Sequence, residues 1–130
     1  MLKVLIVGCG KIAGRQTQLM STHGGAYNSN KNIEIAACFD IDLIKSKNFA
    51  KLYRCQAELN LLDAIKKHKP DIVSVCTPDN THFEITKDLL TNNHNPKVIF
   101  LEKPACQSNN ELGQLINLSK KCNTSIVVNH

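Results

Sequence analysis

The chain alternates short apolar runs with helical patterns from its first residues to its last, and this alternation constrains its fold most. Five runs are nearly all apolar: Lys3–Val7, Ile33–Phe39, Ile72–Cys76, Val98–Leu101 and Ser125–Val128. A weaker strand is expected at Arg54–Ala57. Near-continuous apolar runs are typical of strands that are covered on both faces. The pattern therefore predicts an α/β fold, a doubly wound parallel sheet of about six strands with helices on both faces.

Helical patterns occupy most of the intervals between these strands. They are expected at Lys11–Ser21, Asp42–Leu52, Leu61–His68, Thr81–Thr91 and Ser108–Lys121. Asn60 is a plausible N-cap, and Thr81 and Ser108 each stand three residues before a glutamate, which is the spacing of a capping box. The segment His23–Asn32 is rich in glycine and asparagine, so we predict an exposed loop there.

Length and charge narrow the class of protein. At 130 residues the chain has room for one domain. Its formal charge of +5 is scattered, and the densest basic cluster, Lys66–Lys69, falls at the end of a predicted helix, where cations complement the helix dipole. With few aromatic residues and no arginine-rich run, a nucleic-acid partner is not indicated. No apolar run reaches the ~20 residues of a membrane span.

The six cysteines form no CxxC pair, so the spacing typical of a zinc site is absent and no metal is expected. Several of them lie in or beside the apolar runs. Buried, reduced thiols are typical of a cytoplasmic protein, and we expect that location.

A glycine-rich turn follows the first strand, with the sequence Gly8-Cys9-Gly10-Lys11-Ile12-Ala13-Gly14. It fits the pattern G-x-G-x-x-A. Gly8 would allow a tight turn, Gly10 would let a pyrophosphate approach the backbone, and Ala13 would let the helix pack closely on the sheet. The N-terminus of the following helix would then offer free N–H groups to the phosphates. The position of the turn predicts dinucleotide binding in a Rossmann fold.

The second strand ends at Asp40, where this fold places an acid that accepts hydrogen bonds from the adenosine ribose. A site for NADP would place an arginine or lysine nearby. Instead, Ile41 and Asp42 follow, and the Asp42 carboxylate would repel a 2′-phosphate. We therefore expect NAD, with NADP the less favoured cofactor. A competing interpretation is that Asp40 or Asp42 only caps the next helix, and we expect Asp42 to do so.

Two further motifs lie at predicted carboxyl ends of strands: Thr77-Pro78-Asp79-Asn80-Thr81-His82 and Glu102-Lys103-Pro104. The glycine turn, Asp40 and these two motifs follow one another along the chain in the order found in a known family, and the likeness covers the whole chain. It resembles the N-terminal NAD(P)-binding domain of the Gfo/Idh/MocA oxidoreductases, the family of glucose–fructose oxidoreductase and inositol dehydrogenase.

The resemblance implies a set of site residues. Those expected to contact the cofactor are Gly8, Gly10, Lys11, Ile12, Asp40, Thr77, Pro78, Asn80, His82, Glu102 and Lys103. Lys103 is also the expected catalytic residue, since a lysine there can orient or help deprotonate the hydroxyl on the carbon that loses a hydride. His82 fits a ligand contact and a purely backbone-satisfying role equally well. The resemblance also allows a cis peptide bond before Pro104.

The resemblance further implies a substrate and a missing partner domain. Family members act on sugars, cyclitols or nucleotide-sugars and continue into a second domain that binds the substrate. We therefore expect residues 1–130 to be the cofactor domain alone, which binds NAD(H) and turns over substrate slowly or not at all. A stand-alone NAD sensor without catalysis remains an alternative, although a sensor needs no lysine at position 103. An S-adenosylmethionine methyltransferase is disfavoured, because such enzymes usually carry an acid just before the glycines, where this chain has Leu5-Ile6-Val7.

Overall fold

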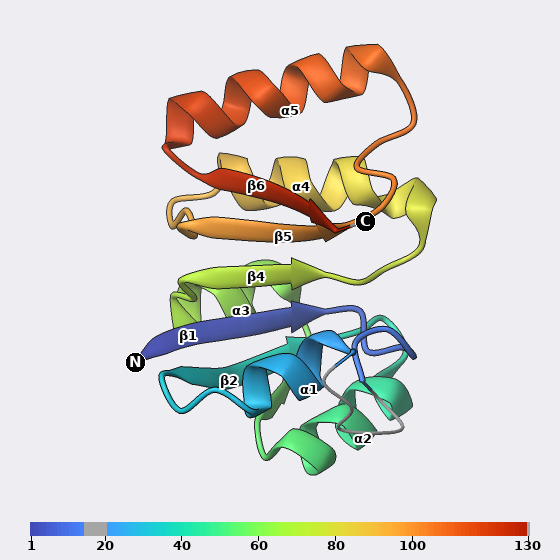
Figure 1. The fold of residues 1–130 in the computed structure, drawn as a ribbon, viewed down its shortest axis with the longest axis vertical. Coiled ribbons are helices and arrows are strands. Elements are labelled where there is room, and N and C mark those ends of the chain that lie inside the picture. Colours follow the sequence, from blue (N-terminus) through green and yellow to red (C-terminus); the bar gives the residue numbers. More distant parts are fainter. Residues whose placement is uncertain (15–20, 130) are drawn as a thin grey trace.

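In the computed structural model, residues 1–14 and 21–129 are described. Within them, six parallel strands form one sheet in the order β3-β2-β1-β4-β5-β6 (Figure 1). The strands are β1 (Leu2–Val7), β2 (Ile33–Phe39), β3 (Gln56–Glu58), β4 (Ile72–Val75), β5 (Val98–Glu102) and β6 (Ser125–Asn129). The order reverses between β1 and β4, which is where open α/β sheets bind ligands. The predicted doubly wound parallel sheet is confirmed.

The central strand β1 shows why these runs become strands. Val4 and Ile6 pack into one hydrophobic cluster and Leu5 and Val7 into another, because successive side chains of a strand point to opposite faces. All four are 0% exposed. A strand covered on both faces favours apolar side chains at every position, and β1 is apolar throughout this stretch.

Helices cover the two faces unequally. Against the Leu5 and Val7 face pack α3 (Leu61–His68), α4 (His82–Thr91) and α5 (Asn109–Cys122). The opposite face is covered, over β1, β2 and β3, by α1 (His23–Asn28) and α2 (Leu43–Tyr53). No helix in the described ranges is both long enough and apolar enough to cross a membrane.

Four of the five predicted helices match α2, α3, α4 and α5 to within a residue at each end. The predicted N-caps Asn60 and Ser108 are confirmed: each side chain accepts a hydrogen bond from a backbone N–H of the first turn, Asp63 and Glu111 respectively. Asp42 caps α2, as expected. The capping box at Thr81 is wrong. A 3₁₀ turn (Asp79–Thr81) precedes α4, and the Thr81 hydroxyl contacts Thr77 and the Pro78 carbonyl instead.

The first helical region also differs from the prediction. Residues 11–14 form a turn, and 15–20 of the predicted helix Lys11–Ser21 lie outside the described residues. The predicted exposed loop His23–Asn32 is wrong for its first half, which forms α1 with His23, Gly24 and Gly25 buried. Gly24 explains the difference: a Cβ there would lie 2.6 Å from the Tyr53 ring and 2.7 Å from the Ala13 carbonyl oxygen. The glycine serves close packing of a helix rather than a turn.

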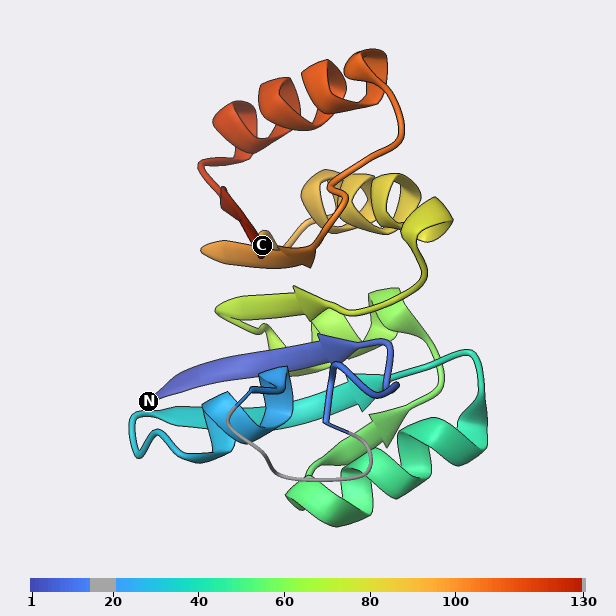
Figure 2. The ribbon, with the colours of Figure 1, turned by 45° about the vertical axis from the view of Figure 1, so that its right-hand side comes forward.

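The loops that follow β1, β2 and β4 gather at one edge of the sheet, the carboxyl edge of the strands (Figure 2). Parallel pairing places all these strand ends on the same side. The glycine turn, Asp40 and the loop after β4 therefore meet at one place, as the sequence predicts.

Candidate functional site

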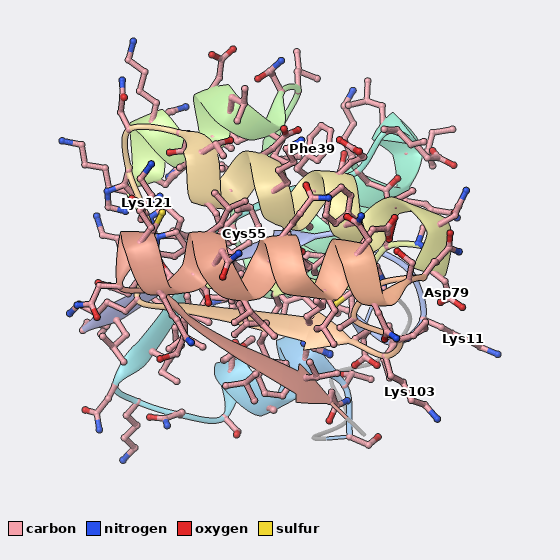
Figure 3. All side chains as sticks on the ribbon, turned by 90° about the horizontal axis from the view of Figure 1, so that it is seen from above. Lys11, Phe39, Cys55, Asp79, Lys103 and Lys121 are labelled. Atoms are coloured by element: carbon pink, nitrogen blue, oxygen red, sulfur yellow. The ribbon has the colours of Figure 1, made fainter. Side chains whose placement is uncertain are left out.

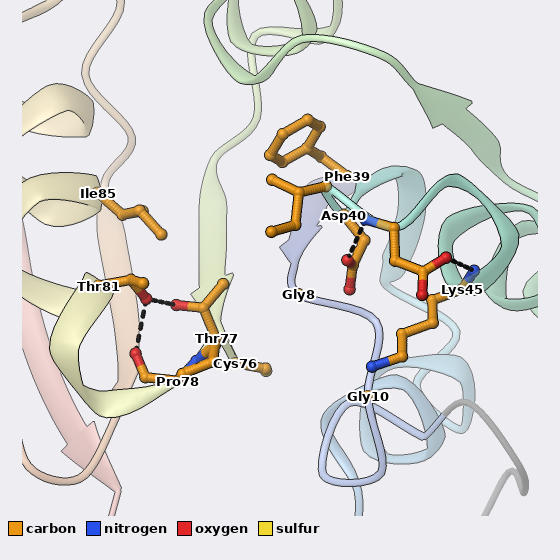
Figure 4. A pocket seen from close by; sticks show the side chains of 12 residues that line it. Gly8, Gly10, Phe39, Asp40, Lys45, Cys76, Thr77, Pro78, Thr81 and Ile85 are labelled. Carbon is orange, nitrogen blue, oxygen red and sulfur yellow. Dashed lines mark hydrogen bonds between the residues drawn. The ribbon is translucent and has the colours of Figure 1, made fainter.

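A cleft of about 490 Å³ opens at this edge, between the loops after β1 and β2 on one side and the loop after β4 on the other (Figure 4). Its walls are formed by Gly8, Gly10, Phe39, Asp40, Ile41, Asp42, Lys45, Cys76, Thr77, Pro78, Thr81 and Ile85. Five of these were predicted from the sequence: Gly8, Gly10, Asp40, Thr77 and Pro78. The structure thus brings residues from three distant segments into one cavity.

Gly8 lines the cleft directly after β1, next to the loop that follows β4. Its φ is +89°, a conformation that side chains disfavour. An added Cβ would lie 2.8 Å from the Cys76 carbonyl carbon and 2.9 Å from the Thr77 methyl group. The glycine therefore lets the turn after β1 touch the loop after β4.

Gly10 faces open space. No atom of residues 1–14 or 21–129 lies within 4 Å of a Cβ built at this residue, so the described part of the chain leaves that side of the backbone bare. A phosphate group can reach the backbone there without meeting atoms of the described residues. This accessible backbone fits the diphosphate of a dinucleotide.

Asp40 links the glycine turn to the end of β2. One carboxylate oxygen accepts the backbone N–H of Cys9 at 2.8 Å, and the other accepts that of Asp42 at 2.8 Å. A carboxylate has about four acceptor positions, so two remain. Because Asp40 also lines the cleft, the remaining positions fit the two hydroxyls of a ribose.

The other predicted contact residues lie around the cleft rather than in its walls. Lys11 and Ile12 are exposed on the turn, and Asn80 is exposed in the 3₁₀ turn before α4. Lys103 is exposed as well, and it extends from the same end of the molecule as Lys11 (Figure 3). The Lys103–Pro104 peptide bond is cis. Whether these side chains contact a cofactor stays a prediction.

His82 lies behind the cleft, with 0% of its surface exposed. Its Nδ1 is 2.6 Å from the Pro104 carbonyl oxygen and its Nε2 is 2.8 Å from the Thr77 carbonyl oxygen. The ring thus joins the loop after β4 to the loop after β5. Of the two roles the sequence left open, this geometry fits the one in which the ring satisfies backbone groups.

Glu102 is also engaged within the protein. Its Oε1 lies 2.5 Å from the Nε2 of His23 and accepts a 2.8 Å hydrogen bond from the Asn129 side chain. Burial disfavours the charged carboxylate, but the hydrogen bonds from His23 and Asn129 outweigh it and lower the pKa of Glu102. Glu102 therefore ties α1 and β6 to the end of β5, directly beside Lys103.

The cleft wall also contains residues that were not among the predicted cofactor contacts: Phe39, Ile41, Asp42, Lys45, Cys76, Thr81 and Ile85. Some could have been found by position. Cys76 ends a predicted strand, and Ile85 follows Thr81 by one helical turn. Burial raises the pKa of the Cys76 thiol, and the nearby Glu102 raises it further, so this wall of the cleft is uncharged. Lys45 was missed because only the two residues directly after Asp40 were weighed as partners of a phosphate.

A parallel sheet whose strand order reverses at β1 and β4, a bare glycine turn after β1 and an acid after β2 define a dinucleotide-binding domain of the Rossmann type. Residues 2–130 match the Gfo/Idh/MocA family, an oxidoreductase family with an NAD-binding Rossmann fold, and the chain belongs to that family.

Three known proteins illustrate the relationship. D-glucoside 3-dehydrogenase of Escherichia coli K12 is 26% identical over 121 residues, which cover 92% of this chain and 32% of that protein. A putative myo-inositol dehydrogenase from Sinorhizobium meliloti 1021 has a TM-score of 0.82 at 21% identity, covering 99% of this chain and 36% of its own. GenD2 from gentamicin A biosynthesis, solved with NAD, has a TM-score of 0.85 at 20% identity. The similarity covers 98% of this chain and 34% of GenD2. The chain thus spans about a third of the length of these proteins.

Proposed function

We propose that this domain binds NAD(H) in the cleft at the carboxyl edge and prefers it to NADP(H). The proposal depends above all on one observation: the bare backbone of Gly10 and the Asp40 carboxylate share one cavity. A diphosphate at Gly10 and a ribose at Asp40 are adjacent parts of the same ligand. A 2′-phosphate on that ribose would meet the carboxylates of Asp40 and Asp42, which supports the preference for NAD.

We further propose that the whole protein is a dehydrogenase in which this domain supplies the cofactor and Lys103. The nicotinamide cofactor, when bound, would supply hydride transfer to or from a carbon that bears oxygen. The exposed Nζ of Lys103 would hydrogen-bond the substrate hydroxyl and take up or return its proton. Glu102, fixed by His23 and Asn129, would hold the backbone from which Lys103 extends.

A sugar, cyclitol or nucleotide-sugar is the proposed class of substrate. D-glucoside 3-dehydrogenase, which is similar over nearly all of this chain, supports a hydroxyl on a sugar ring. The similar proteins are about three times as long, which supports a separate substrate-binding domain. We propose the cytoplasm as the location, because all six cysteines are free thiols and free thiols are typical of a reducing compartment.

A fluorescence titration of the 130-residue protein with NADH and with NADPH tests the cofactor proposal. We expect NADH to bind more tightly. In the variant Gly10→Glu, a bulky and negatively charged side chain occupies the space reserved for the diphosphate, so binding should be abolished. Circular dichroism provides the folding control. Tighter binding of NADPH would contradict the cofactor preference, and unchanged NADH binding by folded Gly10→Glu would contradict the site.

A turnover assay tests the proposal that a separate domain binds the substrate. We expect the 130-residue protein to bind NADH and yet to oxidise it slowly or not at all with a panel of keto-sugars. Rapid turnover by these residues alone would show that they contain a complete active site, and that a separate substrate domain is not needed.

A further inference from the structure

Lys45 is the one cation among the described residues that line the cleft. It lies on the first turn of α2 and is half-buried. In Figure 4 its side chain extends from α2 toward the glycine turn, and its ammonium end lies on the Gly10 side of the cleft. A positive charge therefore stands in the part of the cavity that the bare backbone opens onto.

The backbone that carries Lys45 is firmly held. The Asp42 side chain accepts hydrogen bonds from the N–H groups of Ile44 at 3.0 Å and Lys45 at 3.3 Å. The next residue, Ser46, is 0% exposed, and its hydroxyl donates to the Leu43 carbonyl at 3.0 Å. The first turn of α2 is thus anchored on both sides of Lys45, so the direction in which its side chain leaves the helix is set.

Among the described residues, neither nearby carboxylate forms an ion pair with this ammonium group. Asp40 is bonded to the backbone of Cys9 and Asp42, and Asp42 is bonded to the backbone of α2. None of the ion pairs found among residues 1–14 and 21–129 includes Lys45. Its charge is therefore available to a ligand.

The cation expected from the sequence motif is less well placed. Lys11 is exposed, is not part of the cleft wall and extends away from the molecule (Figure 3). The helix start expected directly after Gly10 is also absent from the described residues, where 11–14 form a turn. Of the positive groups near the turn within the described residues, Lys45 is the one that lines the cavity.

We propose that Lys45 is a cofactor-binding residue whose ammonium group pairs with the diphosphate of the dinucleotide at Gly10. The inference rests on the proposed function, since it assigns a contact within the proposed NAD(H) cleft. Pairing with a 2′-phosphate on the ribose is the competing role. The diphosphate is favoured because the side chain extends toward the glycine turn, and because the ribose end already holds the carboxylates of Asp40 and Asp42.

The test compares three lysine-to-methionine variants, each of which removes a charge and keeps an unbranched side chain. Lys45→Met should weaken the binding of NADH and of ADP-ribose about two- to fivefold, and by the same factor for both, because both ligands carry the diphosphate. Lys11→Met should weaken NADH binding less than Lys45→Met does. Lys47→Met, an exposed neighbour on the same helix, should leave affinity unchanged. Affinity should also fall less steeply with salt in Lys45→Met than in the wild type.

The outcomes separate this inference from the function on which it rests. If the wild type does not bind NADH, the proposed function fails. If the wild type binds and folded Lys45→Met behaves like Lys47→Met, the function stands and the role of Lys45 is refuted. A loss confined to NADPH, with NADH unaffected, would assign Lys45 to the 2′ position and overturn the diphosphate contact.

Discussion

At Gly8 the backbone has a φ of +89°, and a Cβ would stand 2.8 Å from the Cys76 carbonyl carbon. Gly8→Ala therefore combines an unfavourable conformation with a clash against backbone, which cannot move aside cheaply. We expect the free energy of unfolding to fall by about 2–4 kcal/mol. Urea denaturation of the ligand-free protein measures it.

Gly10→Ala is the matched control, two residues away in the same turn. Its Cβ would meet no described residue within 4 Å, so stability should be nearly unchanged while NADH affinity falls. Equal losses of stability in both variants would show that the turn is sensitive to any side chain and that Gly10 is not reserved for a ligand.

Glu102 makes stability depend on pH. Its pKa is lowered in the folded protein, because the hydrogen bonds from His23 and Asn129 outweigh the effect of burial. A carboxyl group of this kind stabilises the fold above its unfolded pKa, and the stabilisation is lost as pH falls through its folded pKa. We expect Glu102→Gln to lower the free energy of unfolding by about 1–2 kcal/mol at pH 7. This difference from the wild type should shrink once pH falls below about 4.

Denaturation midpoints of wild type and Glu102→Gln, measured from pH 3 to pH 8, check this expectation. Glu84→Gln provides the control, since Glu84 is an exposed glutamate on α4. If the loss of stability in Glu102→Gln stays constant across this pH range, the charge of Glu102 is irrelevant and only the shape of its side chain matters.

Replacing two helical glycines by alanine should change stability in opposite directions. Gly24 in α1 packs against Tyr53 of α2, whereas a Cβ at Gly113 in α5 would have none of the atoms in residues 1–14 and 21–129 within 4 Å. Gly24→Ala should lower the free energy of unfolding by about 1–3 kcal/mol through overpacking. Gly113→Ala should raise it by about 0.5–1 kcal/mol, since alanine favours helix. Thermal denaturation of both variants gives the two signs, and a stabilised Gly24→Ala would refute the proposed contact between α1 and α2.

The elements that the sequence predicted well are those whose signal is local. β2 and α3 match the prediction at both ends, because a continuous apolar run and an Asn60 cap are readable from neighbouring residues. α1 was missed because the reason for Gly24 lies in α2, 29 positions away along the chain in Tyr53. Lys45 was missed for a similar reason: its relevance depends on where α2 places its first turn relative to Gly10.

On the scale of the whole molecule, the reversal of strand order divides the sheet into two halves that meet at β1 and β4. The cleft spans this boundary, with Gly8, Gly10 and Asp40 on one side and Thr77 and Pro78 on the other. Within the protein, Gly8 and His82 each help to hold the edge together: Gly8 permits contact between the turn after β1 and the loop after β4, and His82 joins that loop to Pro104. A cofactor bound in the cleft would add a third connection.

Binding should therefore stabilise the carboxyl edge of the sheet selectively. At NADH concentrations of about 100 times Kd, we expect global stability to rise by about 2.7 kcal/mol. Hydrogen exchange resolved by segment should slow in residues 8–14, 39–45 and 76–82, which form the cleft and its rim. Residues 30–32, 69–71 and 94–97, which precede β2, β4 and β5 at the opposite edge, should change only as global stability does. Slowing that is confined to the amino edge would place the ligand elsewhere. Slowing in 8–14 and 39–45 without 76–82 would restrict the bound ligand to one half of the sheet, because a dinucleotide that crosses the boundary must contact both.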